Sequence, residues 1–164
     1  RKTRNAFREI RTDKPDHPIR VGVIGEYFTV MDDFSNLGLE QMLADMGVEV
    51  HRWMNPTNRN LHYKGQKNLG VQISEYSRFE MGPTSTANIW CAKNYAENGF
   101  DGLIHVKSAG CTPEIDIMPV LENISRDYKI PILYLTYDSQ TSDTGLQTRV
   151  EAFNDMLRMR RAAV

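Results

Sequence analysis

The sequence has little cysteine, with two residues among 164. Two thiols cannot form the disulfide framework of a small secreted protein, and they suit a reducing compartment such as the cytoplasm. No run approaches the roughly 20 apolar residues of a membrane-spanning helix, and the first residues do not resemble a secretory signal. The formal net charge of −1 gives no general attraction to nucleic acid or to an anionic membrane. These absences predict a cytoplasmic protein with no nucleic-acid or membrane partner.

The chain also lacks an initiator methionine, because it begins at Arg1, and this suggests a piece of a longer protein. Residues 1–14 carry six basic and two acidic side chains, but Phe7 is the only aromatic residue among them. A nucleic-acid site usually combines a basic stripe with aromatic side chains, so this segment is more typical of a solvated end. Two prolines within residues 12–18 end any helix there. We therefore predict an N-terminal arm or linker, 1–18, followed by one α/β domain, 19–164.

Short β-branched runs and longer runs of helical period alternate from residue 19 onward. Short runs predict strands and the longer ones predict helices. The predicted strands are 19–25, 48–54, 100–108 and 130–138. The predicted helices are 32–47, 82–99, 112–129 and 142–161. Residues 55–80 show no clear pattern, which predicts either a functional insertion or a helix near 71–79.

Several residues mark the ends and faces of these helices. Asp33 or Ser35 is a candidate cap for the first helix, and Gly47 a candidate end. In the third helix Thr112 is the candidate cap, Pro113 takes the first position, and Pro119 predicts a kink. Pro83 and Gly99 bound the second helix. The last helix has an apolar face formed by Leu146, Val150, Phe153 and Leu157.

Alternating strands and helices predict a parallel sheet covered on both faces, which is a three-layer Rossmann-like or flavodoxin-like domain. Right-handed crossovers predict the strand order 2-1-3-4, with the switch point between strands one and three. Ligands of such sheets bind beyond the carboxyl ends of the strands. The candidate site residues are therefore Glu26 and Tyr27, the turn from Lys107 to Cys111, and residues 137–139.

Common motifs of this fold class are missing. The sequence has no G-x-G-x-x-G and no G-x-x-x-x-G-K-[ST], which argues against a dinucleotide site and a P-loop. Glu26 and Tyr27 stand where a flavodoxin has a hydroxyl-rich phosphate loop. The third strand lacks the phosphorylatable Asp of a receiver domain, and no C-x-x-C or H-x-x-x-H spacing predicts a zinc site.

Cys111 is the candidate with the most chemistry. It lies at a predicted helix start, where the helix dipole favours the thiolate that attacks electrophiles and binds iron. Three alternatives stay open: a buried apolar residue, a metal ligand, or a nucleophile with a histidine base. The sequence does not pair any of the four histidines, His17, His51, His62 and His105, with this thiol. Cys91 lies in the middle of a predicted helix and is expected in the core.

Three segments of the chain carry a family resemblance, in order and at a typical spacing. They are VGVIGEYFTVMDDFSNLGLEQMLADMGVEV (21–50), NGFDGLIHVKSAGCTPEI (98–115) and IPILYLTYDSQTSDTGLQTRVEAF (130–153). They resemble the C-terminal part of the 2-hydroxyacyl-CoA dehydratase D-component and benzoyl-CoA reductase family, especially its version in long CoA-substrate-specific enzyme activase proteins. The resemblance covers residues 20–157, and Ser108-Ala109 replace the Pro-Phe of the family pattern.

The resemblance implies a [4Fe-4S] cluster held between two α/β domains, with one cysteine from the later domain, and Cys111 matches that cysteine. It also implies reductive dehydration of a 2-hydroxyacyl-CoA. The implied partners are a preceding cluster-binding domain, an ATP-dependent activator domain or subunit, and the acyl-CoA. Because such a cluster needs several thiolates, we expect this chain alone to be free of the cluster and inactive.

Three further residues are candidates for contact with the acyl-CoA or the cluster: Glu26, Tyr27 and Arg149. Glu26 and Tyr27 follow the first strand, where hydrogen bonding to loops is the plain alternative. Arg149 suits a CoA phosphate, or else an ion pair with a loop carboxylate. Glu114 suits the positive end of a helix dipole. The alternative function is a non-catalytic α/β binding or interaction domain that keeps the fold without the cluster.

Overall fold

A four-stranded parallel sheet forms the centre of the computed structural model, which describes residues 2–13, 15–61, 69–79 and 81–163. The strands are β1 (Arg20–Gly25), β2 (Glu49–His51), β3 (Gly102–Ser108) and β4 (Ile132–Tyr137), in the order β2-β1-β3-β4. The predicted fold class and strand order are confirmed. Strand β2 is shorter than its predicted range of 48–54 because the backbone N–H of Trp53 donates to the Tyr95 hydroxyl rather than to the sheet.

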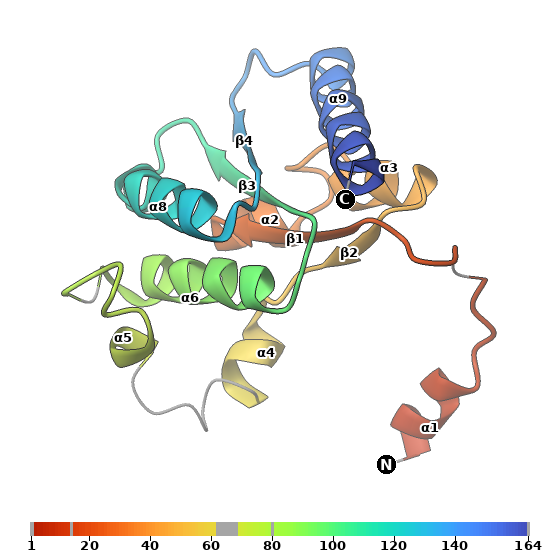
Figure 1. Cartoon of the computed structure of the whole chain (residues 1–164), viewed down its shortest axis with the longest axis horizontal. Coiled ribbons are helices and arrows are strands. Elements are labelled where there is room, and N and C mark those ends of the chain that lie inside the picture. The colour runs from red at the N-terminus through yellow and green to blue at the C-terminus, as the bar shows by residue number, and fades with distance from the viewer. Residues whose placement is uncertain (1, 14, 62–68, 80, 164) are drawn as a thin grey trace.

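Helices cover both faces of this sheet (Figure 1). α6 (Pro83–Glu97) and α8 (Met118–Tyr128) lie on one face, and α3 (Leu39–Asp45) and α9 (Asp143–Ala162) lie on the other. Two strand glycines allow helices to pack closely on the sheet. A Cβ at Gly22 would clash with the Tyr95 ring of α6 at 2.5 Å. A Cβ at Gly102 would clash with the Phe153 ring of α9 at 2.8 Å. The three predicted layers are therefore present.

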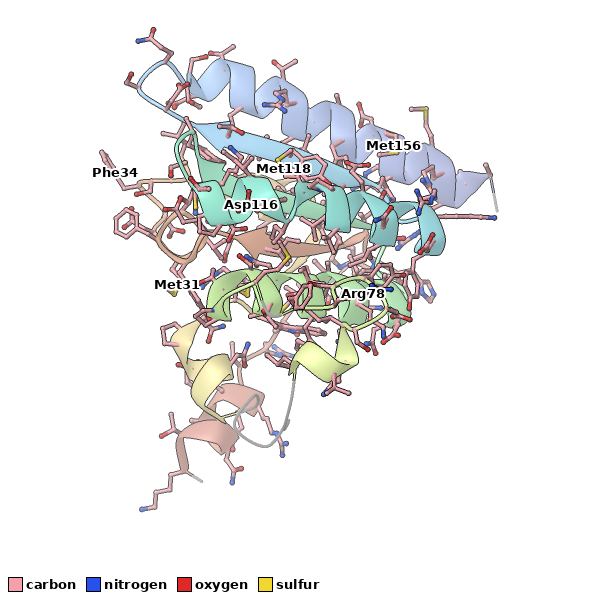
Figure 2. All side chains as sticks on the ribbon, turned by 90° about the vertical axis from the view of Figure 1, so that its left-hand side faces the viewer. Met31, Phe34, Arg78, Asp116, Met118 and Met156 are labelled. Carbon is pink, nitrogen blue, oxygen red and sulfur yellow. The ribbon has the colours of Figure 1, made fainter. Side chains whose placement is uncertain are left out.

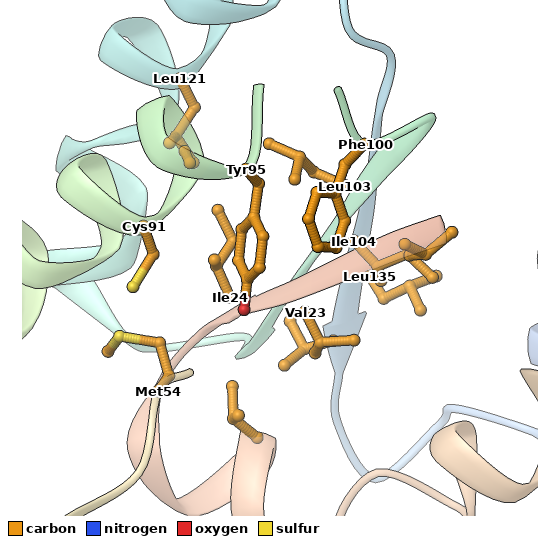
Figure 3. Packing of buried hydrophobic residues seen from close by; sticks show 14 of the residues in the cluster. Val23, Ile24, Met54, Cys91, Tyr95, Phe100, Leu103, Ile104, Leu121 and Leu135 are labelled. Carbon is orange, nitrogen blue, oxygen red and sulfur yellow. The ribbon is translucent and has the colours of Figure 1, made fainter. Parts of the chain in front are cut away.

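Tyr95 connects the α6 layer to the sheet, and Figure 3 shows its ring beside Ile24 and Phe100. Its side chain is fully buried and stacks on Trp53 with a centroid distance of 4.1 Å. The Tyr95 hydroxyl donates to the carbonyl of His51 at 3.0 Å. A large aromatic ring buried in this way contributes much apolar area, and its hydroxyl satisfies the backbone where β2 ends.

The predicted ends of two long helices agree with the structure. Pro83 is in the first turn of α6, and Gly99 follows the helix with a φ of 68°. Ser142 caps α9 by accepting a hydrogen bond from the Gly145 N–H. The predicted apolar face of α9 is buried.

The helix predicted over 32–47 is wrong at its start. The structure has α2 (Tyr27–Met31), then a turn, then α3, and neither Asp33 nor Ser35 is a cap. The turn is stabilised by Asn36, whose buried side chain accepts from the Leu39 N–H and donates to the Thr29 carbonyl. The predicted end is confirmed, because Gly47 follows α3 with a φ of 72°.

The helix predicted over 112–129 is two helices, α7 (Thr112–Asp116) and α8. Cys111, not Thr112, occupies the N-cap position of α7. Pro119 lies in the first turn of α8, where its missing N–H costs nothing, so it starts a new helix instead of kinking an old one. Figure 2 shows Asp116 and Met118 where one helix passes into the next.

Residues 55–80 are only partly described. α4 (Pro56–Leu61) and α5 (Leu69–Gln72) are short helices, so the predicted helix near 71–79 is wrong. The segment after α5 turns because the buried Ile73 side chain holds it against the core. His62 lies outside the described residues.

The N-terminal segment contains α1 (Lys2–Arg8), which lies apart from the sheet in Figure 1. The division into an arm, 1–18, and a domain, 19–164, stays a prediction. Within the described parts of the chain, none of the helices is long and apolar enough to cross a membrane.

Candidate functional site

The candidate site begins where β1 and β3 end side by side. Gly25 closes β1 with a φ of 137°, and a Cβ at this position would lie 1.9 Å from the Val106 carbonyl oxygen. Only glycine allows so close an approach of the two strands. The next residue, Glu26, donates its backbone N–H to the same Val106 carbonyl at 3.0 Å. This close approach places the Glu26 carboxylate beside Ser108, the last residue of β3.

The Glu26 carboxylate bonds directly to the turn that carries Cys111. Its Oε2 atom accepts from the Ser108 N–H at 2.8 Å and from the Thr29 hydroxyl at 2.9 Å. Partial burial acts to raise the pKa of Glu26, but these hydrogen bonds and the positive charge of Lys107 outweigh it and lower the pKa below its ordinary value. Glu26 is therefore an ionised group whose hydrogen bonds join β1 to the 108–111 turn.

Cys111 is half-buried at the end of this turn. Its N–H donates to the Ser108 carbonyl at 3.2 Å, and its own carbonyl accepts from Ile115 in α7. Burial, with the charges of Glu26 and Glu114, raises the pKa of the thiol, although the Glu114 backbone N–H and Lys107 act in the opposite direction. The helix start does act to lower this pKa through the Glu114 N–H, but burial and the two nearby carboxylates outweigh it, so the expected net lowering is wrong.

A buried polar network lies behind Cys111, and sequence reasoning missed it. Glu114 is fully buried, and both of its carboxylate oxygens accept from Asn88 Nδ2 at 2.9 Å. His105 Nε2 lies 2.9 Å from Glu114 Oε2. Glu114 lies in the first turn of α7, where it was expected to complement the helix dipole, and it also connects α7 to α6 and β3.

Asn88 extends the network to the end of β1. Its Oδ1 accepts from the Gly25 N–H at 2.9 Å, and its Nδ2 donates to the Gly25 carbonyl at 3.0 Å. Ser85, one turn earlier in α6, donates to the Pro113 carbonyl at 3.2 Å. Buried polar groups are costly unless they are paired. The pairs therefore fix α7 and Cys111 relative to β1 and α6.

The histidines in the described residues do not form a nucleophile pair with Cys111. His105 faces Glu114, and His51 Nε2 lies 2.7 Å from Glu49 Oε1. No hydrogen bond joins Cys111 to a histidine within the described part of the chain. The described part of the chain thus offers no histidine base for a cysteine nucleophile.

Arg149 and Tyr27 lie in two different helices of the site. Arg149 is on α9, where it donates to the Tyr134 carbonyl at 2.6 Å, and it forms no ion pair with a carboxylate of the described residues. It lines a hollow of about 310 Å³ between the end of β4 and the start of α9, together with Tyr137 and Ser142. Tyr27 is half-buried in the first turn of α2.

The donor set fits one ligand of an iron–sulfur cluster and not a whole cluster. Cys91 is fully buried in the core, as predicted, and Figure 3 shows it on α6 between Met54 and Leu121. Among the described residues, no group of three or more His, Cys, Asp or Glu side chains is arranged to hold a metal ion. Cys111 alone presents a partly exposed thiol at the ligand-binding edge of the sheet.

The C-terminal half of the chain has a counterpart among known families. Residues 80–157 match the family model of the 2-hydroxyglutaryl-CoA dehydratase D-component. The match supports the dehydratase resemblance over α6, β3, α7, α8, β4 and most of α9. It includes Cys111 and its buried network, whereas Glu26 and Tyr27 lie outside the matched residues. No curated protein matches the chain.

Proposed function

We propose that this chain is a domain of an iron–sulfur 2-hydroxyacyl-CoA dehydratase of the activase-linked type. Cys111 supplies one ligand to a [4Fe-4S] cluster shared with a preceding cluster-binding domain. The observation that carries the proposal is the position of Cys111: a partly exposed thiol at the switch point of the sheet, inside the matched segment. Ligands of open α/β sheets bind at this place.

The number of thiols in this chain implies that other parts of the enzyme supply the remaining cluster ligands. A cluster of this type is held by several thiolates, so the remaining ligands come from the preceding domain and the chain alone is inactive. When bound, the cluster supplies one-electron reduction, and an ATP-dependent activator domain or subunit delivers the electron. We place the enzyme in the cytoplasm, where a reducing environment keeps thiols free.

The acyl-CoA contacts lie around the same edge in this proposal. The exposed guanidinium of Arg149 lines the hollow, and only one of its nitrogens donates to the Tyr134 carbonyl, so the others can bind a CoA phosphate. Glu26 and Tyr27 face the reacting end of the substrate from the start of α2. Glu26 is fixed by two hydrogen bonds and accepts protons poorly, so it orients the acyl group rather than exchanging protons with it.

The test is iron and acid-labile sulfide in the full-length protein carrying Cys111→Ser. We expect loss of most of the cluster, because serine is a poor substitute for a thiolate ligand. Cys91→Ala is the matched control: it removes the other thiol of this chain and should keep wild-type iron content. Unchanged iron in Cys111→Ser would refute the proposal.

A second candidate function is a non-catalytic α/β interaction domain. Two observations favour it: the raised pKa of the Cys111 thiol, which disfavours the ligand form, and Ser108-Ala109 in place of Pro-Phe. Wild-type iron content in Cys111→Ser would support this second function.

A further inference from the structure

Lys107 is a buried cation at the candidate site. It is the next-to-last residue of β3 and is only 6% exposed. Its ammonium group has a long contact of 3.5 Å with the Ser108 carbonyl. Within the described residues, Lys107 forms no ion pair with a carboxylate. A lysine is almost never this buried without a partner, because an unpaired buried charge is costly.

The two carboxylates of the candidate site already have hydrogen-bond partners. Glu26 accepts from Ser108 and Thr29, and Glu114 accepts from Asn88 and lies against His105. Among the described residues, neither carboxylate forms an ion pair with the ammonium group of Lys107. The chain by itself therefore leaves a positive charge at this edge without a direct counter-ion.

The same edge holds the Cys111 backbone. The Ser108 carbonyl oxygen accepts from the Cys111 N–H at 3.2 Å and lies 3.5 Å from Lys107 Nζ. One oxygen thus joins the ammonium group and the start of α7. The Lys107 charge also acts to lower the pKa of both Glu26 and Cys111, which agrees with its contact with the turn between them.

We propose that Lys107 is the cation that balances the negative charge of a thiolate-ligated cluster at this edge and thereby raises its reduction potential. The inference rests on the proposed function. Net charge and nearby donors are among the factors that set the potential of an iron–sulfur cluster. Lys107 is accordingly a tuning residue for electron acceptance and not a ligand.

The experiment compares Lys107→Met, Lys107→Gln and Lys107→Arg in the full-length protein. Iron per protein and the midpoint potential of the cluster are measured for each. We expect the two neutral variants to keep the cluster with a more negative potential, and Lys107→Arg to stay close to wild type because it keeps the charge. Lys129→Met is the matched control, since it removes a lysine just before the amino end of β4, at the opposite edge of the sheet.

The outcomes separate this inference from the proposed function. If Cys111→Ser loses iron while both neutral Lys107 variants keep the wild-type potential, only the role of Lys107 is overturned. If Cys111→Ser keeps its iron, the proposed function fails and this inference with it. Iron loss in the neutral variants with retention in Lys107→Arg supports a required charge, whereas iron loss in all three contradicts it.

Discussion

The two ends of the candidate site are built differently. At the β1–β3 end, Gly25, Asn88 and Glu114 are buried and joined by side-chain hydrogen bonds. At the β4–α9 end, Arg149 is exposed and borders an open hollow. A ligand of a metal cluster must be held in place, whereas a flexible substrate can be met by adaptable side chains. The difference suits a fixed cluster ligand at one end and contact with a long acyl-CoA at the other.

Among the substitutions that test this difference, Asn88→Ala should cause the largest loss in the free energy of unfolding. It removes the side-chain partner of both backbone groups of Gly25, and it leaves the buried Glu114 carboxylate with His105 alone. Each unsatisfied buried group costs about 1–3 kcal/mol, so we expect a loss of about 3–5 kcal/mol in the free energy of unfolding. Urea unfolding monitored by circular dichroism measures it.

Two controls sharpen this result. Asn94→Ala removes a bond to the Trp90 carbonyl on the same helix, and Arg149→Gln alters the other end of the site. Both side chains lie at or near the surface, so each change should stay within about 0.5 kcal/mol. If Asn88→Ala lowers the free energy of unfolding no more than these controls, the two ends of the site do not differ in how firmly they are held.

Gly25→Ala should have the next largest effect. The added Cβ would meet the Val106 carbonyl at 1.9 Å, and the φ of 137° is unfavourable for any residue with a side chain. We expect a loss of about 2–3 kcal/mol in the free energy of unfolding. Gly110→Ala is the matched control, because a Cβ there has no neighbour within 4 Å, and its effect should lie within about 0.5 kcal/mol. Equal losses in both variants would contradict a close, rigid approach of β1 to β3 at Gly25.

The sequence predicts the parts of this fold that depend on local pattern. Apolar runs define the four strands, and Pro83 and Gly99 define α6, because strand burial and helix ends leave marks within a few residues. Pro119 shows the limit of such marks, since a proline suits both a kink and a first turn. Only the packing of α7 and α8 decides between them.

The buried network could not be predicted in the same way. Asn88 and Glu114 are 26 residues apart, and Asn88 and Gly25 are 63 apart. In the sequence Asn88 is one polar residue in a helix, and Glu114 is an acidic residue in a first turn, which is common on surfaces. The direction of the Cys111 pKa shift was predicted wrongly for the same reason. The burial of the thiol and the two nearby carboxylates arise only in the folded chain.

The most direct test of the account measures iron, acid-labile sulfide and visible absorption in the purified 164-residue chain and in the full-length protein. The account states that this chain supplies one ligand, Cys111, to a cluster shared with another domain. It predicts a four-iron cluster in the full-length protein and none in the chain alone. Copurification of iron, sulfide and a charge-transfer band with the chain alone would contradict it, as would a full-length protein without iron.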